Sequence, residues 1–144
     1  MPPTLPLRAR SKSNTVTRVE SYTIAEASER TGLTAHTLRY YERAGLLAPP
    51  SRATSGHRRY SEQDLGMLRI LTRLKATGMS IAEMRRYAEL CRVGPQTYGT
   101  RREMLEAHRQ QVLDRIAALQ TDLELIESKI KHYAEGDTRD LASP

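Results

Sequence analysis

At 144 residues the chain has room for one domain, or for a small domain joined to an extended element. Its formal charge is +6, and a single cysteine excludes both an intrachain disulfide framework and a CxxC metal site, which fits a cytoplasmic protein. No apolar run approaches the roughly 20 residues that a membrane-spanning helix needs. Residues 100–144 carry seven basic against nine acidic side chains, so the basic excess lies in the first 99 residues. This asymmetry suggests that the front of the chain binds a polyanion.

The N-terminal part divides into a tail and a helical pair. Residues 1–20 combine Pro, Ser and basic side chains, a composition that predicts a disordered basic tail. Thr23 is a suitable N-cap for a short helix to about Arg30. A glycine turn follows, and Thr34 can cap a second helix that ends at Gly45. Two short helices joined in this way are typical of a helix-turn-helix, whose second helix enters the DNA major groove.

The segment after this helix predicts a small basic hairpin. Residues 49–60 read PPSRATSGHRRY, which is too short and too rich in Gly and Pro for a helix. A basic hairpin directly after a recognition helix is a wing. Two further helices then follow, one starting at Ser61 and ending before Gly78, and one starting with the capping box of Ser80 and Glu83. Residues 21–95 are therefore predicted to form a winged helix-turn-helix domain that includes a helix pair.

The last segment carries the most regular apolar pattern in the chain. Apolar residues alternate in steps of four and three, which predicts a coiled-coil dimerisation helix over residues 100–134 and a flexible tail over residues 135–144. Such a helix would be on the order of 50 Å long, too long for a small domain to cover, although it could also fold back on its own domain. The predicted dimerisation residues are Leu105, Val112, Ile116, Leu119, Leu123, Ile126, Ile130 and Tyr133, with Arg109 interrupting the pattern.

These pieces, in this order, resemble the MerR family of bacterial transcription regulators. The resemblance is strongest in LRYYERAGLL, in GHRRYS and in GMSIAEM, and it covers about residues 22–134. It implies a mainly α fold, with a winged helix-turn-helix domain followed by a long C-terminal coiled-coil dimerisation helix. It also implies a homodimer, paired through antiparallel helices, that binds a palindromic promoter element, bends and untwists the DNA in response to an effector, and shares that DNA with RNA polymerase. Because about ten residues follow the coiled coil, we expect a small member without a large effector domain.

Candidate DNA contacts lie on the second helix and on the wing. An Arg fork suits the guanine edge, so Arg39 is the first candidate for a contact with a base edge or with an adjacent phosphate. Tyr40 and Tyr41 point about 100° apart, so one ring should pack against the core; the resemblance favours Tyr41 as the outward ring, or both hydroxyls reaching phosphates. Glu42 is expected to orient an arginine. The predicted DNA-binding residues are Thr34, His36, Thr37, Arg39, Tyr40, Tyr41 and Arg43 on the helix and Arg52, His57, Arg58, Arg59 and Tyr60 on the wing.

The sequence is less informative about an effector. Cys91 is either a small buried hydrophobe or a redox or effector residue, and His108 and His132 are expected at the surface. No cofactor or metal site is predicted, because the chain lacks a set of thiolate ligands. Two alternative functions remain, an architectural DNA binder and a coiled-coil interaction protein. An enzyme is the weakest interpretation, because the sequence shows no catalytic constellation.

Overall fold

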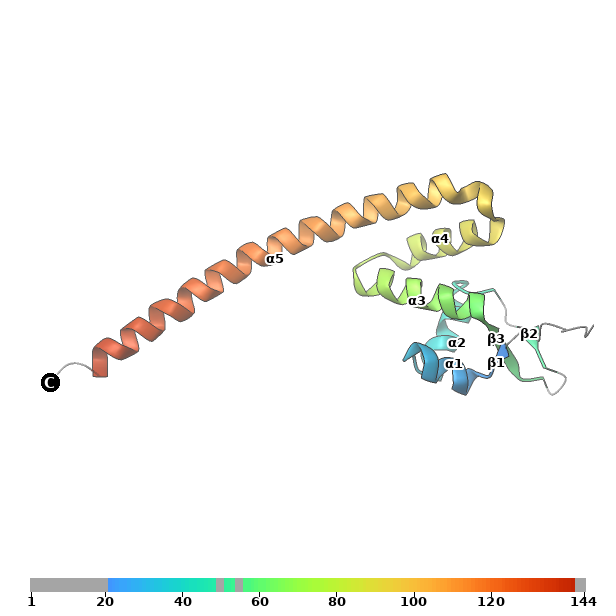
Figure 1. Ribbon diagram of the computed structural model, residues 1–144, viewed down its shortest axis with the longest axis horizontal. Coiled ribbons are helices and arrows are strands. Elements are labelled where there is room, and N and C mark those ends of the chain that lie inside the picture. The colour runs from blue at the N-terminus through green and yellow to red at the C-terminus, as the bar shows by residue number, and fades with distance from the viewer. Residues whose placement is uncertain (1–20, 49–50, 54–55, 142–144) are drawn as a thin grey trace, which may run out of the picture.

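The protein is described by a computed structural model that covers residues 21–48, 51–53 and 56–141. The disordered tail predicted for residues 1–20 lies outside these ranges. Figure 1 shows a compact head of short elements and one long helix that projects away from it. In chain order the elements are β1 (Ser21–Tyr22), α1 (Ile24–Thr31), α2 (Ala35–Arg43), β2 (Ser51–Arg52), β3 (Arg58–Ser61), α3 (Glu62–Ala76), α4 (Ile81–Val93), the 3-10 turn η1 (Pro95–Thr97) and α5 (Tyr98–Leu141).

Capping residues mark where α1 begins and ends and where α2 begins. Thr23 and Glu26 form a capping box at the start of α1, and Gly32 ends this helix in the left-handed conformation with φ of 73°. The Thr34 side chain then accepts a hydrogen bond of 3.1 Å from the backbone N–H of Thr37 at the start of α2. Both predicted short helices are therefore confirmed, together with their caps.

The wing is one edge of a three-stranded sheet in the order β1-β3-β2. Strands β2 and β3 pair antiparallel, with Arg52 opposite Arg58. On its other side β3 pairs with β1, where Tyr22 lies opposite Tyr60. The sequence predicted the hairpin but not β1, which ties the start of the helix-turn-helix to the base of the wing.

The core of the head lies between α1, α2, α3 and the inner face of β3. Leu65, Leu68 and Leu71 of α3 are fully buried and recur at intervals of three residues, as expected of one helix face. Helix α4 returns over α3 after the capping box of Ser80 and Glu83, and it contributes the buried Met84. Burying these side chains is the main stabilising contribution to the head.

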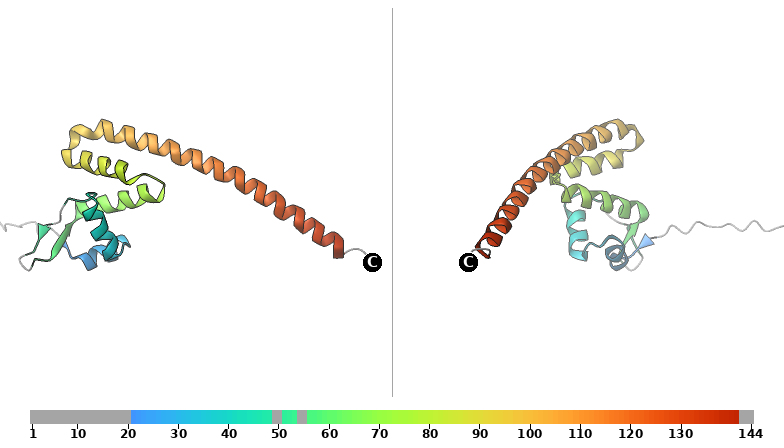
Figure 2. Two further views of the ribbon diagram at one scale, coloured as in Figure 1. Left: turned by 180° about the vertical axis from the view of Figure 1, so that it is seen from behind. Right: turned by 60° about the vertical axis from the view of Figure 1, so that its left-hand side comes forward.

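Helix α5 is longer than predicted. Its 44 residues correspond to roughly 66 Å at 1.5 Å per residue. It begins at Tyr98 and continues beyond Ala134 to Leu141, so the flexible tail predicted from residue 135 is helical as far as residue 141. Figure 2 shows the helix curving gently along its length, and only its first part lies over α4.

His108 joins α5 to the end of α3. Its side chain is buried, and its Nε2 lies 2.7 Å from the hydroxyl oxygen of Thr77, at the end of α3. The expectation that His108 lies at the surface is therefore wrong, because the turn after α3 folds against α5. His132, farther along the same helix, is exposed as expected.

Candidate nucleic-acid interface

Helix α2 presents a polar stripe to solvent. Its buried residues are Leu38 and Tyr41, which face the core. His36, Arg39, Tyr40 and Arg43, which recur at steps of three and four residues, are exposed. A stripe of this kind on the second helix of a helix-turn-helix is the surface that enters the major groove in DNA-binding proteins of this class. The structure thus brings four of the predicted contact residues onto one face.

The two adjacent tyrosines divide between surface and core. The Tyr40 side chain is 37% exposed, whereas that of Tyr41 is 2% exposed. The expectation that Tyr41 is the outward ring is therefore wrong, and so is its assignment as a DNA contact, because the helix turns this position onto the core. The amino group of Lys75, from α3, lies 5.6 Å from the centre of the Tyr40 ring. Sequence reasoning did not find this additional cation beside the stripe.

An ion pair links the recognition helix to the wing. The Nε atom of Arg58 in β3 lies 3.0 Å from a carboxylate oxygen of Glu42 in α2, and both side chains are mostly buried. Glu42 was expected to orient an arginine, and this expectation is confirmed. Because charge pairs shielded from solvent resist separation, the contact holds the wing at a fixed position relative to α2.

The remaining wing residues have different environments. Arg59 donates hydrogen bonds to the Ser21 hydroxyl and to the Ser21 carbonyl oxygen, at 3.0 and 2.9 Å, and so braces β3 against β1. Burial, followed by the charge of Glu42, raises the pKa of Tyr60, whose side chain is fully buried. The assignment of Tyr60 as a phosphate contact is therefore wrong, because this strand position faces the core. His57 is exposed at the wing, and the side chain of Arg52 lies outside what the structure describes.

Two arginines of α4 donate hydrogen bonds to backbone carbonyl groups just after the end of α2. The Arg85 Nε donates a hydrogen bond of 2.5 Å to the carbonyl oxygen of Ala44, and Arg92 donates one of 2.7 Å to that of Gly45. These carbonyls follow the last residue of α2, where unpaired acceptors gather at a helix C-terminus. The two contacts join the segment that follows α2 to α4, the helix that precedes α5. Neither contact was predicted, because the bonded residues lie 41 and 47 positions apart in the sequence, and such separations leave no periodic signal.

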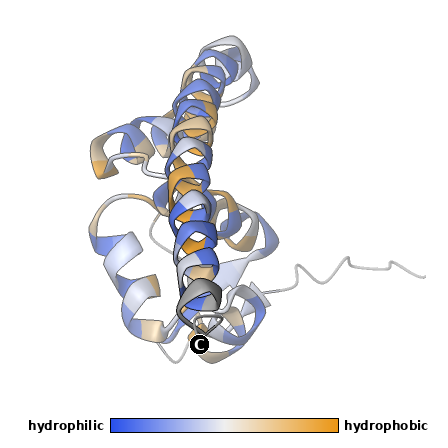
Figure 3. Ribbon diagram, turned by 90° about the vertical axis from the view of Figure 1, so that its left-hand side faces the viewer, coloured by the Kyte–Doolittle hydropathy of each residue, from blue (hydrophilic) through white to orange (hydrophobic). Residues whose placement is uncertain are grey.

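The long helix exposes the apolar seam predicted for dimerisation. Ile116 is 51% exposed and Tyr133 is 69% exposed, and Figure 3 shows apolar positions recurring along α5. Leu105 differs, because it packs against the core of its own head. Large apolar side chains in such a row on a helix indicate a surface that another molecule covers. The exposed seam residues are Ile116, Leu119, Leu123, Ile126, Ile130 and Tyr133, while Val112 is half-buried.

The remaining candidate residues are Cys91 and the side chains that could bind a metal ion. Cys91 is half-buried on α4, and its sulfur lies 3.5 Å from a guanidinium nitrogen of Arg101. Across residues 21–141, apart from the two short gaps, no group of three or more His, Cys, Asp or Glu side chains could hold a metal ion. Within the same ranges, no helix combines the length and apolar character that crossing a membrane requires.

Comparison with known proteins places this architecture in a family. A model described as MerR HTH family regulatory protein matches residues 22–91, and one described as MerR, DNA binding matches residues 65–128. An HTH-type transcriptional regulator of Haemophilus influenzae is 39% identical over 113 residues, which cover 78% of this chain and 84% of that protein. The regulator AdhR of Bacillus subtilis is 37% identical over 91 residues, or 63% of this chain and 65% of AdhR.

Solved structures give the same result. The crystal structure of HiNmlR, a MerR family regulator lacking the sensor domain and bound to promoter DNA, matches with a TM-score of 0.73 and 37% identity, covering 83% of this chain and 94% of that one. A MerR family regulator from Listeria monocytogenes matches with a TM-score of 0.74 and 34% identity, covering 83% and 96%. The motifs, the winged head and these relatives agree, and the chain belongs to the MerR family of HTH transcriptional regulators.

Proposed function

We propose that the protein is a cytoplasmic, homodimeric transcription regulator that binds a palindromic promoter element and bends and untwists it in response to an effector. The exposed stripe of α2, with Arg39 at its centre, is the observation that carries this proposal. The 37% identical regulator whose crystal structure contains promoter DNA supports the choice of ligand. RNA polymerase would be the partner on the same DNA.

The stripe and the wing supply different contacts. Arg39 and His36 are positioned to reach base edges in the major groove, where a bidentate arginine contact contributes about 1 to 3 kcal/mol of discrimination. Arg43 and the exposed wing residue His57 flank these positions and suit phosphate contacts, which set register without reading sequence. Arg58 and Arg59 retain part of their surface, and their bonds to Glu42 and Ser21 would hold the wing rigid against the backbone.

The charges along α5 favour antiparallel pairing of its apolar seam with the seam of a second copy. Residues 101–115 contain four arginines against three acids, whereas residues 122–137 contain five acids against two lysines. An antiparallel pair places these oppositely charged halves together, while a parallel pair would place like against like. Two-fold symmetry, which most dimers have, follows directly from such a pairing.

The pattern also defines a register. When Ile116 of one copy faces Leu119 of the other, Val112 faces Leu123 and Leu105 faces Ile130, so that six of the eight seam residues have an apolar partner from the seam. Arg109 then lies opposite Ile126, where its aliphatic stem can pack and its charged end can reach solvent. Tyr133 then lies opposite Arg102.

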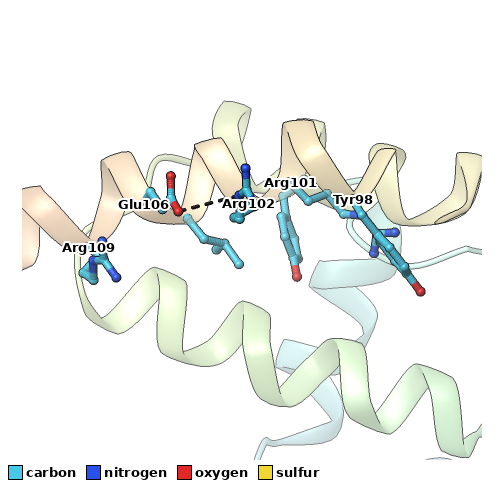
Figure 4. Close-up of a pocket in the computed structure, with 7 residues that line it drawn as sticks. Tyr98, Arg101, Arg102, Glu106 and Arg109 are labelled. Atoms are coloured by element: carbon cyan, nitrogen blue, oxygen red, sulfur yellow. Dashed lines mark ion pairs between the residues drawn. The ribbon is translucent and has the colours of Figure 1, made fainter. Parts of the chain in front are cut away.

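This register brings the partner's Tyr133 to a groove at the start of α5. The groove has a volume of about 460 Å³ and lies between α4 and α5, as Figure 4 shows. Tyr98 and Arg102 line it, and Arg102 is ion-paired with Glu106 at 3.7 Å. Leu105 supplies an apolar wall. A tyrosine suits such a mixed surface, since its ring packs on apolar atoms while its hydroxyl reaches polar ones.

DNA binding is tested with a fluorescent duplex that carries the palindrome from the protein's own promoter region. We expect affinity for this duplex at least about 1,000-fold above that for a scrambled duplex, with two protein chains bound per duplex. A phased-bending assay on the same fragment measures the predicted distortion. Equal affinity for both duplexes would instead indicate an architectural DNA binder, and absent DNA binding would favour a coiled-coil interaction protein.

The direction of the dimer is tested by cross-linking in a Cys91→Ser background. Val112→Cys and Leu123→Cys are made as separate variants and are oxidised both alone and as a mixture. An antiparallel pair in the stated register forms a disulfide only in the mixture, because position 112 faces position 123. A parallel pair would form a disulfide in each variant alone, and this outcome would refute the arrangement.

A further inference from the structure

A second hollow lies in the head and shares Tyr87 and Arg101 with the groove assigned to the partner helix. It has a volume of about 590 Å³, within the range of small-molecule sites. Leu47, Met67, Ile70 and Tyr87 supply apolar surface from three separate segments of the chain. The hollow therefore combines the size and the apolar lining that a ligand of about a dozen heavy atoms needs.

The polar side of the hollow is cationic. Arg101 and Arg92 both line it. The guanidinium of Arg101 lies over the Tyr98 ring at 4.5 Å and donates hydrogen bonds to the Gly94 carbonyl at 3.2 Å and to the Cys91 sulfur at 3.5 Å, but its Nε is buried with no hydrogen-bond partner in the described part of the chain. Asp64 also lines the hollow, and its carboxylate accepts a hydrogen bond of 2.9 Å from the Ser61 backbone N–H.

A half-buried guanidinium with unused donor capacity favours an anionic ligand group. Arginine offers five N–H donors in a planar fork that matches a carboxylate, and it cannot lose its charge. An unpaired buried donor is costly, so a ligand oxygen at this position would be bound strongly. The apolar surface opposite would take the hydrocarbon part of the same molecule.

The position of the hollow connects it to DNA recognition. Leu46, Leu47 and Ala48, which form part of its wall, directly follow the loop that closes α2. Arg92, another part of the wall, donates to the Gly45 carbonyl. A ligand in the hollow would thus touch both the helix that leads to α5 and the segment that leads into the wing.

We propose that this hollow binds a small amphipathic carboxylate, with Arg101 as the anion-binding residue, and that binding alters the affinity of the protein for DNA. The coupling to DNA rests on the function proposed above, whereas binding itself does not. Coupling requires that the ligand bind the DNA-bound and free conformations differently, and it then acts equally in both directions.

Binding is tested on the full-length dimer with 1-naphthoate and octanoate, each compared with its neutral alcohol, 1-naphthalenemethanol or 1-octanol. Cys91 is the single cysteine of the chain and lines the hollow, so its rate of alkylation by iodoacetamide reports occupancy. At least one carboxylate is expected to slow alkylation saturably, with an affinity about tenfold or more above that of its alcohol. No saturable protection by either carboxylate, or equal protection by the alcohols, would overturn the proposal.

Two variants locate the site. Arg101→Met should weaken protection by the carboxylate about tenfold, while Arg86→Met, which removes an arginine of α4 outside the lining, should leave it unchanged. Gly66→Leu fills the hollow from α3, where an added Cβ meets no atom within 4 Å, and leucine favours the helix over glycine. This variant should abolish protection while remaining folded by circular dichroism. Unchanged protection in either variant would contradict the assignment.

The effect on DNA is measured separately with the fluorescent duplex. Saturating carboxylate should change the dissociation constant for the duplex by about fivefold or more in the wild type and not in Gly66→Leu. Protection without any change in DNA affinity would overturn the coupling. Protection by a protein that does not bind DNA at all would instead refute the proposed function while upholding the site.

Discussion

The head and the long helix satisfy their apolar side chains in opposite ways. In the head, Leu38, Leu65 and Leu68 are fully buried by other parts of the same chain. Along α5, Leu119 and Ile130 are at least 60% exposed and contact no other part of the described chain closely enough to be covered. The head can therefore form its core alone, whereas α5 leaves its apolar seam uncovered. In the proposed dimer, this difference separates residues whose loss would unfold the protein from residues whose loss would separate the two copies.

The largest effect is expected when a charge is placed in the apolar seam of α5. Leu123→Glu would put an unpaired carboxylate into the dimer interface twice, once from each copy. The combined cost of at least about 4 kcal/mol should weaken dimerisation about 1,000-fold or more, as measured by analytical ultracentrifugation. The head should keep its fold, because Leu123 does not contribute to its core.

Leu125→Glu is the matched control for this change. Leu125 is 64% exposed on the same helix, two residues from Leu123, but it lies outside the alternating seam. Its replacement should leave the dimer intact. If both variants dissociated equally, or if neither did, the seam would not be the dimer interface.

Tyr40 and Tyr41 allow a test of the difference between an exposed and a buried side chain within the head. Tyr41→Ala removes a ring that is buried in the core and should lower the free energy of unfolding by about 3 kcal/mol or more. Tyr40→Ala should lower it by less than about 1 kcal/mol, because this ring lies at the surface. Urea denaturation at one protein concentration measures both. A larger loss for Tyr40→Ala than for Tyr41→Ala would reverse the assignment of the two rings.

Arg39 is expected to affect DNA recognition without affecting stability. Arg39→Ala should weaken binding to the palindromic duplex by about 5- to 150-fold, corresponding to about 1 to 3 kcal/mol, and should reduce discrimination against a scrambled duplex. Lys131→Ala, which removes a cation from α5 far from the head, serves as the control. Equal losses on both duplexes would show that Arg39 contacts phosphate and not a base edge.

Local signals predicted the fold well because each acts over a few residues. Capping residues such as Thr23, Thr34 and Ser80 mark helix starts through hydrogen bonds to groups three residues away, and the structure contains all three caps. The heptad pattern likewise predicted a long helix with an exposed apolar seam. The end of α5 was placed too early, because the acidic residues near its C-terminus gave no sign of where the helix stops.

Contacts between distant segments were harder to predict. The side of α2 that faces the core depends on how α3 packs against it, and this is why Tyr41 was assigned to the wrong face. Tyr60 was read as part of a basic run, although strand β3 turns it inward. The burial of His108 depends on the turn that contains Thr77. Basic character indicated the region of the proposed DNA-binding surface, but not which of its side chains are exposed.

A small effect on the free energy of unfolding is expected for Glu83, at the start of α4, which links the head to α5. Glu83 accepts hydrogen bonds from the backbone N–H and the hydroxyl of Ser80, at 3.1 and 3.0 Å, and these bonds lower the pKa of its carboxyl group. A carboxyl whose pKa is lower in the folded state stabilises the protein at pH values above its unfolded pKa, and this contribution disappears as the pH falls through the folded pKa. Glu83→Gln should therefore destabilise the head near pH 7 by less than about 1 kcal/mol, since the group is exposed.

The sign of the pH dependence distinguishes this cap from a general loss of helix stability. The difference in unfolding free energy between wild type and Glu83→Gln should be constant at neutral pH and should shrink below the ordinary carboxyl range, because the wild-type side chain becomes neutral as well. Glu103→Gln, a change of the same type on α5, is the matched control for the loss of a carboxylate outside this cap. A difference that persisted unchanged at low pH would mean that the Glu83 charge does not stabilise the start of α4, and that the backbone contact from Ser80 alone is sufficient to position this helix beneath α5.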